Sequence, residues 1–171
     1  MATIRFKPEF LKPIINPRVI DAGMMRLGHF KDKTTRIKPK KLGEYEIICG
    51  IPPRPLYNQM KTGILVEITE VHHKAIKDYS EEELIGDVGH CDTQKFVDKL
   101  NLINKARKTC KLTSDWQGYL HYLKYKRGGE DVDGTLKEID DIKFRWAMFQ
   151  QENPNLLFGK LCKMFAKQEG M

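Results

Sequence analysis

The feature that most constrains the fold is the segment GILVEITEV at residues 63–71. If this segment is a β-strand, its apolar Ile64, Val66 and Ile68 point to one face and Glu67 points to the other. The alternation therefore predicts a strand with one buried face. A fold for this chain must contain a sheet in which that strand is paired.

Three further segments have the composition of strands: residues 3–6, 34–37 and 45–49. A turn over residues 39–43 separates the last two. The segment at residues 51–62 contains three prolines, which exclude a helix or an inner strand. We expect it to form the rim of a binding cleft.

Two helices are expected in the middle of the chain. Ser80 and Glu83 have the spacing of a capping box, which predicts a short acidic helix over residues 81–85. Asp92 or Thr93 begins a longer amphipathic helix. The apolar face of that helix consists of Phe96, Leu100 and Ile103.

The C-terminal third has a different pattern. Four residues at helical spacing predict an aromatic-rich helix: Trp116, Tyr119, Leu120 and Leu123. Another helix is expected over residues 156–165. Residues 142–148 (IKFRWAM) alternate apolar and charged side chains, which favours a strand, although the flanking LKEIDD and FQQEN favour a helix. We interpret residues 142–148 as a strand.

Positive charge is concentrated near the N-terminus. The chain has 30 Lys and Arg against 23 Asp and Glu, a net charge of +7. Residues 31–41 (KDKTTRIKPKK) alone contain six basic residues and one acid. Such a density attracts polyanions, because each neutralised phosphate releases counterions. A solvated basic turn is the alternative interpretation.

Several classes of protein are not expected. No apolar stretch approaches the ~20 residues of a membrane span, and the N-terminus lacks the pattern of a signal peptide, so a cytoplasmic protein without membrane contact is predicted. The four cysteines form no C-x-x-C pair and are predicted to be free thiols. No metal site is expected, because His72, His73, His90 and Cys91 match no zinc module. Signatures of phosphate loops and dinucleotide sites are missing, so no cofactor is expected.

The basic segment carries a recognisable motif. KDKTTRI, which begins at Lys31, is followed by KLGEYEI from Lys41. Together they resemble the ASCH domain family of the PUA-like superfamily, whose hallmark is G-x-K-x-x-T-x-R entering a strand, followed by a lysine-glycine-acid turn. Lys31, Thr34 and Arg36 fall on the lysine, threonine and arginine of this hallmark. The opening FKPEF also looks like the start of such domains, whereas His29 stands where the hallmark has its glycine.

The resemblance implies an α+β fold, with a small, mostly antiparallel β-barrel of PUA-like type flanked by helices and a helical C-terminal extension. Residues 1–108 are then expected to form the ASCH/PUA-like domain. Residues 109–171 are expected to form a mainly helical extension packed on this core. The strand at residues 142–148 would close the barrel.

The same resemblance implies nucleic-acid binding, with RNA or another single strand favoured and RNA processing as a further expectation. Phosphates are expected to bind the basic side chains, and an unpaired base is expected to stack on a cleft aromatic. The candidate binding residues are Lys31, Lys33, Arg36, Lys38, Lys40, Lys41, Arg54 and Tyr57.

Two alternatives belong to other classes. Some family members are amidohydrolases that act on acetylated cytidine, and others are ribonucleases; the first role implies Lys31, Thr34 and Asp87 as catalytic residues. Burial and like charge would lower the pKa of such a lysine, so that it takes a proton from Thr34, provided that Lys31 precedes the strand. The other alternative is an adaptor or inhibitor whose aromatic extension binds a protein partner or a second copy of the chain.

Overall fold

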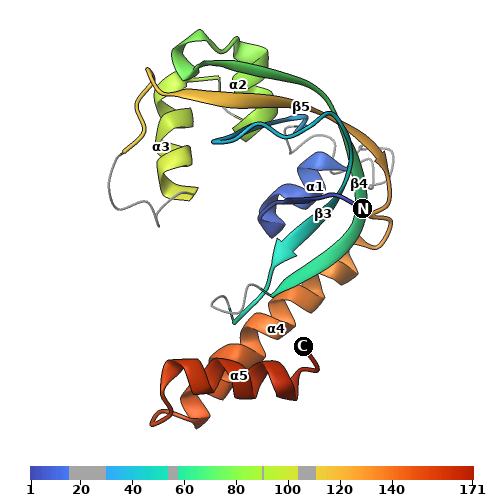
Figure 1. Ribbon diagram of the computed structural model, residues 1–171, viewed down its shortest axis with the longest axis vertical. Helices are drawn as coiled ribbons and strands as arrows, with labels where there is room; N and C mark the ends of the chain where they lie inside the picture. Colours follow the sequence, from blue (N-terminus) through green and yellow to red (C-terminus); the bar gives the residue numbers. More distant parts are fainter. Residues whose placement is uncertain (16–29, 54–57, 90, 104–110) are drawn as a thin grey trace.

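The computed structural model describes residues 1–15, 30–53, 58–89, 91–103 and 111–171. Its centre is a five-stranded, mostly antiparallel sheet that curls into a half-barrel, with helices packed on it (Figure 1). The α+β class expected from the sequence is therefore confirmed. The curl of the sheet agrees with the barrel-like part of that expectation.

The strand order in the sheet is β1-β3-β4-β5-β2. The strands are β1 (Thr3–Arg5), β2 (Lys33–Arg36), β3 (Gly43–Gly50), β4 (Gln59–Ala75) and β5 (Gln117–Arg127). Only β1 and β3 pair in parallel, and the other neighbours are antiparallel. Register shifts interrupt β3 and β4, and such irregularities increase the local twist of a sheet.

The curl brings the two edge strands, β1 and β2, within reach of a single side chain. Arg36 Nη2 at the end of β2 donates a hydrogen bond to the Arg5 carbonyl oxygen of β1 at 2.7 Å. The guanidinium of Arg36 also lies over the ring of Phe6, 4.8 Å from its centroid. Arg36 therefore bridges the open side of the half-barrel.

The helices are η1 (Pro8–Phe10), α1 (Leu11–Ile14), η4 (Ile76–Asp78), α2 (Glu81–Val88), α3 (Thr93–Ile103), α4 (Val132–Glu152) and α5 (Phe158–Gln168). The capping box predicted for α2 is confirmed, because Ser80 Oγ accepts from Glu83 N and the Glu83 carboxylate accepts from Ser80 N. At the start of α3, Asp92 Oδ1 accepts from Lys95 N. The sequence thus located both helix starts.

Two apolar clusters form the core of the described residues. The larger one fills the concave side of the sheet, where Phe6 and Phe10 pack with Ile47 and Val66 of β3 and β4. The smaller one lies between α2, α3 and the start of β5 and includes Leu120. The sheet therefore has apolar partners on both of its faces.

Helices α4 and α5 form an arm that extends away from the sheet (Figure 1). The first half of α4 is anchored in the larger core through the fully buried Ile139. Farther along, Trp146 of α4 packs edge-on against Phe165 of α5, with ring centroids 5.0 Å apart. The arm is thus held by its own aromatic contacts and by the burial of the N-terminal half of α4 in the larger core.

The predicted strands at residues 3–6, 34–37, 45–49 and 63–71 are confirmed as β1 to β4. The exclusion of an inner strand from residues 51–62 is wrong for residues 59–62, because β4 begins at Gln59 and pairs there with β3. The three prolines precede this point in the chain. The aromatic-rich helix expected around Trp116 to Leu123 is wrong, because residues 117–127 form β5. Leu120 belongs to the smaller core cluster and Leu123 to the larger. Burial on both faces of a strand produced the spacing that we interpreted as helical.

The strand predicted at residues 142–148 is also wrong, because these residues lie within α4. Of the alternating apolar side chains, Ile142 is buried but Phe144 is 67% exposed. The spacing that packs α4 runs instead through Ile139, Ile142, Trp146 and Phe149, which is the period of a helix. The closing strand is absent from this position, and β5 lies beyond the predicted domain boundary at residue 108.

Candidate functional site

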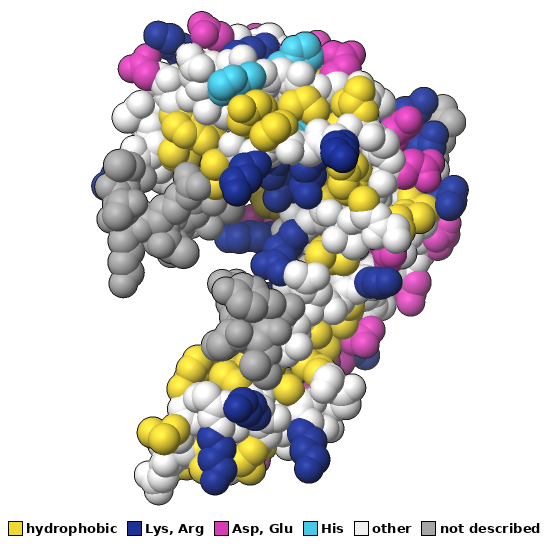
Figure 2. Space-filling view, in the orientation of Figure 1, with side chains coloured by type: hydrophobic (Ala, Val, Ile, Leu, Met, Phe, Trp, Pro, Cys, Tyr) yellow, Lys and Arg dark blue, Asp and Glu magenta, His cyan; other side chains and the backbone are white. Residues whose placement is uncertain are grey.

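A cavity of about 1000 Å³ lies on the open side of the half-barrel, between the edge strands and the arm. Figure 2 shows the hollow between the sheet and the arm, with Lys and Arg side chains on its walls. Among the described residues, four cations line the cavity: Arg5, Lys7, Arg36 and Lys143. Five aromatic side chains from the same part of the chain line it as well: Phe6, Phe10, Trp116, Trp146 and Phe158.

Lys31 and Asp87 form a buried ion pair at the back of this cavity. The two side chains are 2% and 5% exposed, and Lys31 Nζ lies 2.9 Å from Asp87 Oδ1. Lys31 Nζ also donates to the carbonyl oxygens of Lys33 and Asp87. An ammonium group has three hydrogens, so all the donors of Lys31 are used.

Aromatic rings and hydrogen bonds complete the surroundings of this pair. Lys31 Nζ lies 4.7 Å from the ring centroid of Phe10 and 5.7 Å from that of Phe6. Thr35 Oγ1 donates to Asp87 Oδ2 at 2.7 Å and is 2.9 Å from Tyr79 Oη. Burial lowers the pKa of Lys31, while the charge of Asp87 opposes that shift. The pair ties the entry of β2 to the end of α2.

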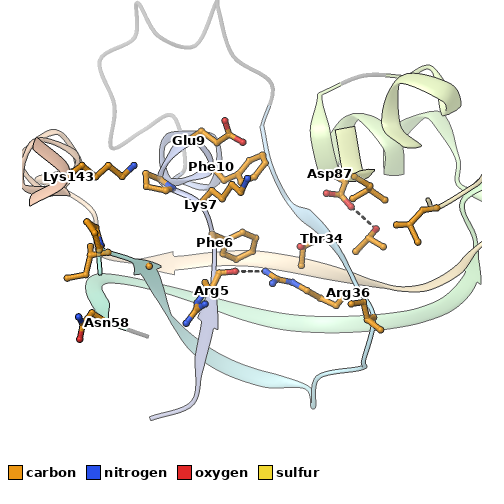
Figure 3. A pocket seen from close by; sticks show the side chains of 18 of the residues that line it. Arg5, Phe6, Lys7, Glu9, Phe10, Thr34, Arg36, Asn58, Asp87 and Lys143 are labelled. Atoms are coloured by element: carbon orange, nitrogen blue, oxygen red, sulfur yellow. Dashed lines mark hydrogen bonds between the residues drawn. The ribbon is translucent and has the colours of Figure 1, made fainter. Parts of the chain in front are cut away.

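Arg36 and Asn58 each present a hydrogen-bond donor without a partner. Both residues line the cavity, and Figure 3 shows Arg36 extending from β2 toward Arg5 and Phe6. Arg36 Nε and Asn58 Nδ2 are buried, and neither has a hydrogen-bond partner among the described residues. Most buried donors in proteins are paired, so these two are exceptions among the described residues. Both atoms are covered by protein, and an acceptor oxygen in the cavity would reach them only after the side chain rotates.

A buried histidine fixes the backbone on either side of Arg36. His121 of β5 is fully buried, and burial lowers its pKa. Its Nδ1 is 3.3 Å from the Thr34 carbonyl oxygen, and its Nε2 is 3.0 Å from Lys40 N. These contacts fit a neutral ring that donates from Nδ1 and accepts at Nε2. His121 thereby holds β2 and the following turn in place.

The three residues predicted as catalytic are only partly brought together. Lys31 precedes β2, as the hydrolase hypothesis requires, and it contacts Asp87. Thr34 is 5% exposed and lines the cavity, but the hydroxyl that bonds to Asp87 is that of Thr35. The hydroxyl that contacts the predicted catalytic carboxylate therefore belongs to the neighbour of the predicted threonine.

The predicted phosphate-binding residues are dispersed. Lys33 is buried beside Asp32, at 3.0 Å, and over the ring of Tyr122. Lys38 and Lys41 are exposed, and Lys40 is half-buried with its Nζ over the ring of Tyr45. These four lysines do not line the cavity. Arg54 and Tyr57 lie outside the described residues.

Several residues of the site were missed by sequence reasoning. Phe6 and Phe10 were noticed only within the opening FKPEF, and Asn58 gave no signal. Lys143 and Trp146 were assigned to a strand, so their joint approach to the cavity was hidden. A helical period across residues 139–149 would have placed both on one helix. It would not have predicted that this helix lies beside the barrel.

Further observations concern metals and membranes. Within the described ranges, no group of three His, Cys, Asp or Glu side chains is arranged to bind a metal ion. None of the helices in the described part of the chain is long and apolar enough to cross a membrane.

A scan against protein-family models, a search of curated proteins and a search of solved structures found no match to the chain.

Proposed function

We propose that the cavity binds single-stranded nucleic acid, with RNA favoured. The observation that supports this most is the combination of cations and aromatic rings in one open cavity, which Arg36 and Asn58 also line. A single strand exposes the two groups that such a site can bind, which are its unpaired bases and its phosphates. Their bases stack on aromatic side chains, and their phosphates accept hydrogen bonds from cations.

The charge of the lining favours an anionic ligand. The four cations face two carboxylates, Glu9 and Asp87, and Asp87 is already paired with Lys31. Within the described ranges, none of these four cations forms an ion pair with a carboxylate, so the lining carries an excess of positive charge. An isolated apolar ligand would leave these groups unused.

An assignment to the PUA-like superfamily, and to the ASCH family within it, is part of the proposal. It is supported by the curled five-stranded sheet and by the position of Lys31 directly before β2. The contact between Lys31 and Asp87 also agrees with the lysine and acid that the resemblance nominated. These features give the basic segment a structural role as well as a ligand-binding one.

Hydrolysis of an acylated nucleoside is the second candidate, because Thr34 lines the cavity within the segment that begins at Lys31. The bonding of Lys31 favours binding over hydrolysis. A general base needs a free lone pair, whereas Lys31 Nζ uses three donors on Asp87 and Lys33. A hydrolase would have to release Lys31 from Asp87 before Thr34 lost its proton.

The test is the binding of fluorescent twelve-nucleotide RNA, single-stranded DNA and duplex DNA across a salt series. We expect both single strands to bind more tightly than the duplex. Each phosphate contact to a single strand contributes about −0.7 to the slope of log K against log salt, so four cations predict a slope of about −3. Equal affinity for the duplex, or a slope near zero, would contradict the proposal. Acetylated cytidine is incubated in parallel, and release of acetate would favour the hydrolase.

A further inference from the structure

We propose that helix α4 forms the second wall of the binding site, and that the bound strand passes from Arg36 across the cavity onto Lys143 and Gln150. The site would then take an oligonucleotide of several residues rather than one nucleoside. This inference rests on the proposed function and adds how long the bound strand is. It also gives a role to the arm, which lies outside the motif at residues 31–47.

The first support is the spacing of the cavity residues on α4. Lys143, Trp146 and Gln150 all line the cavity and are three and four positions apart. Residues at such intervals lie on one face of a helix. One continuous stripe of α4, two turns long, therefore faces the edge strands. Phe158 at the start of α5 extends the same wall.

The second support is the chemistry of that stripe. Lys143 is exposed, and none of the ion pairs among the described residues includes it. Figure 3 shows its side chain directed from α4 toward η1, where Lys7 and Glu9 lie. Gln150 offers both a donor and an acceptor, which suits the edge of a base. The ring of Trp146 is half-buried and offers a stacking surface.

Packing within the arm explains only part of this arrangement. Trp146 contacts Phe165 and Phe158, with ring centroids 5.0 and 6.3 Å apart, so its position also serves the arm itself. Packing through Ile142, Trp146 and Phe149 also brings Lys143 and Gln150 to the cavity, but it does not require a cation and an amide at these two positions. A ligand that bridges the barrel and the arm would use both groups.

The third support is size. The cavity of about 1000 Å³ is at the upper end of the range for sites that enclose one drug-sized molecule. Sites for single strands on small barrels accommodate about four or more nucleotides. Cations lie on both walls, Arg5, Lys7 and Arg36 on the barrel side and Lys143 on the arm. This separation suits successive phosphates better than the single phosphate of a mononucleotide.

The test measures affinity against length, using uridine 5′-monophosphate and oligouridylates of two, four, eight and twelve residues. The variants are Lys143→Ala, Gln150→Ala and the double variant, and the matched control is Lys163→Ala, an exposed lysine of α5 that does not line the cavity. We expect the double variant to bind the octamer roughly tenfold more weakly than wild type and the dimer equally well. The control should match wild type at every length.

The outcomes separate this inference from the function on which it rests. In one outcome, wild type binds the oligomers, Arg36→Ala lowers the affinity, and the double variant on the arm binds them as wild type does. The arm is then not a wall of the site, and this inference is overturned while the proposed function stands. If wild type binds none of the oligomers, the proposed function fails with it. Equal binding of a polyglutamate peptide would identify an acidic protein segment as the occupant and would also overturn the inference.

Discussion

Replacing Asp87 with alanine is expected to lower the free energy of unfolding by about 3–5 kcal/mol, because it leaves the buried ammonium of Lys31 without a counter-charge. The same change frees the Thr35 hydroxyl, which donates to Asp87 in the native structure. Urea unfolding of wild type and Asp87→Ala, followed by circular dichroism, measures the difference. A smaller urea midpoint with an unchanged slope is the expected form of the result.

Two further variants give this prediction its controls. Asp115→Ala removes the partner of Lys77 in an exposed ion pair and should change stability by less than about 1 kcal/mol. The double variant Lys31→Met with Asp87→Leu removes both charges, so its loss of stability should be well below the sum of the losses in the single variants Lys31→Met and Asp87→Leu. Additive losses would show that the two charges do not depend on each other in the folded protein.

Replacing Arg36 with alanine is expected to weaken single-strand binding by roughly 10- to 100-fold, which corresponds to ~1.5–3 kcal/mol for hydrogen bonds from a charged donor. Arg36 lines the cavity, and its guanidinium lies over the ring of Phe6. The salt slope should also fall by about 0.7, the share of one phosphate. Fluorescence anisotropy with a labelled twelve-nucleotide RNA measures both quantities.

Arg36 also bridges the edge strands, so an effect on folding must be separated from one on binding. Arg36→Lys keeps the charge but loses the planar donor group. We expect it to retain the salt slope of wild type with an intermediate affinity. Arg127→Ala removes an exposed arginine at the end of β5 and should bind as wild type does. Equal losses in Arg36→Ala and Arg127→Ala would mean that only net charge matters.

Local patterns in the sequence predicted the parts of the fold that depend on local chemistry. Alternation identified β4, and the reciprocal bonds of Ser80 and Glu83 identified the start of α2. β5 was missed because its two faces are covered by different clusters, which hides the period of two. For α4, the pattern of residues 142–148 was ambiguous, and the expectation that the barrel needs a late closing strand decided for a strand where the structure has a helix.

The site depends on long-range contacts that local patterns cannot report. Lys31 and Asp87 are 56 positions apart in the chain, and only the family resemblance brought them together in advance. Lys143 approaches the barrel because α4 leaves the sheet at a particular angle, which follows from packing around Ile139. The density of charge in residues 31–41 did not distinguish a buried lysine such as Lys31 from an exposed one such as Lys38.

Tryptophan fluorescence can show whether single-stranded nucleic acid occupies the cavity. Both tryptophans of the chain, Trp116 and Trp146, line the cavity. Titration with unlabelled oligouridylate should change their emission with the dissociation constant that anisotropy gives, because bases stack on aromatic rings there. Binding seen by anisotropy with no change in tryptophan emission would place the strand elsewhere on the protein and contradict the account.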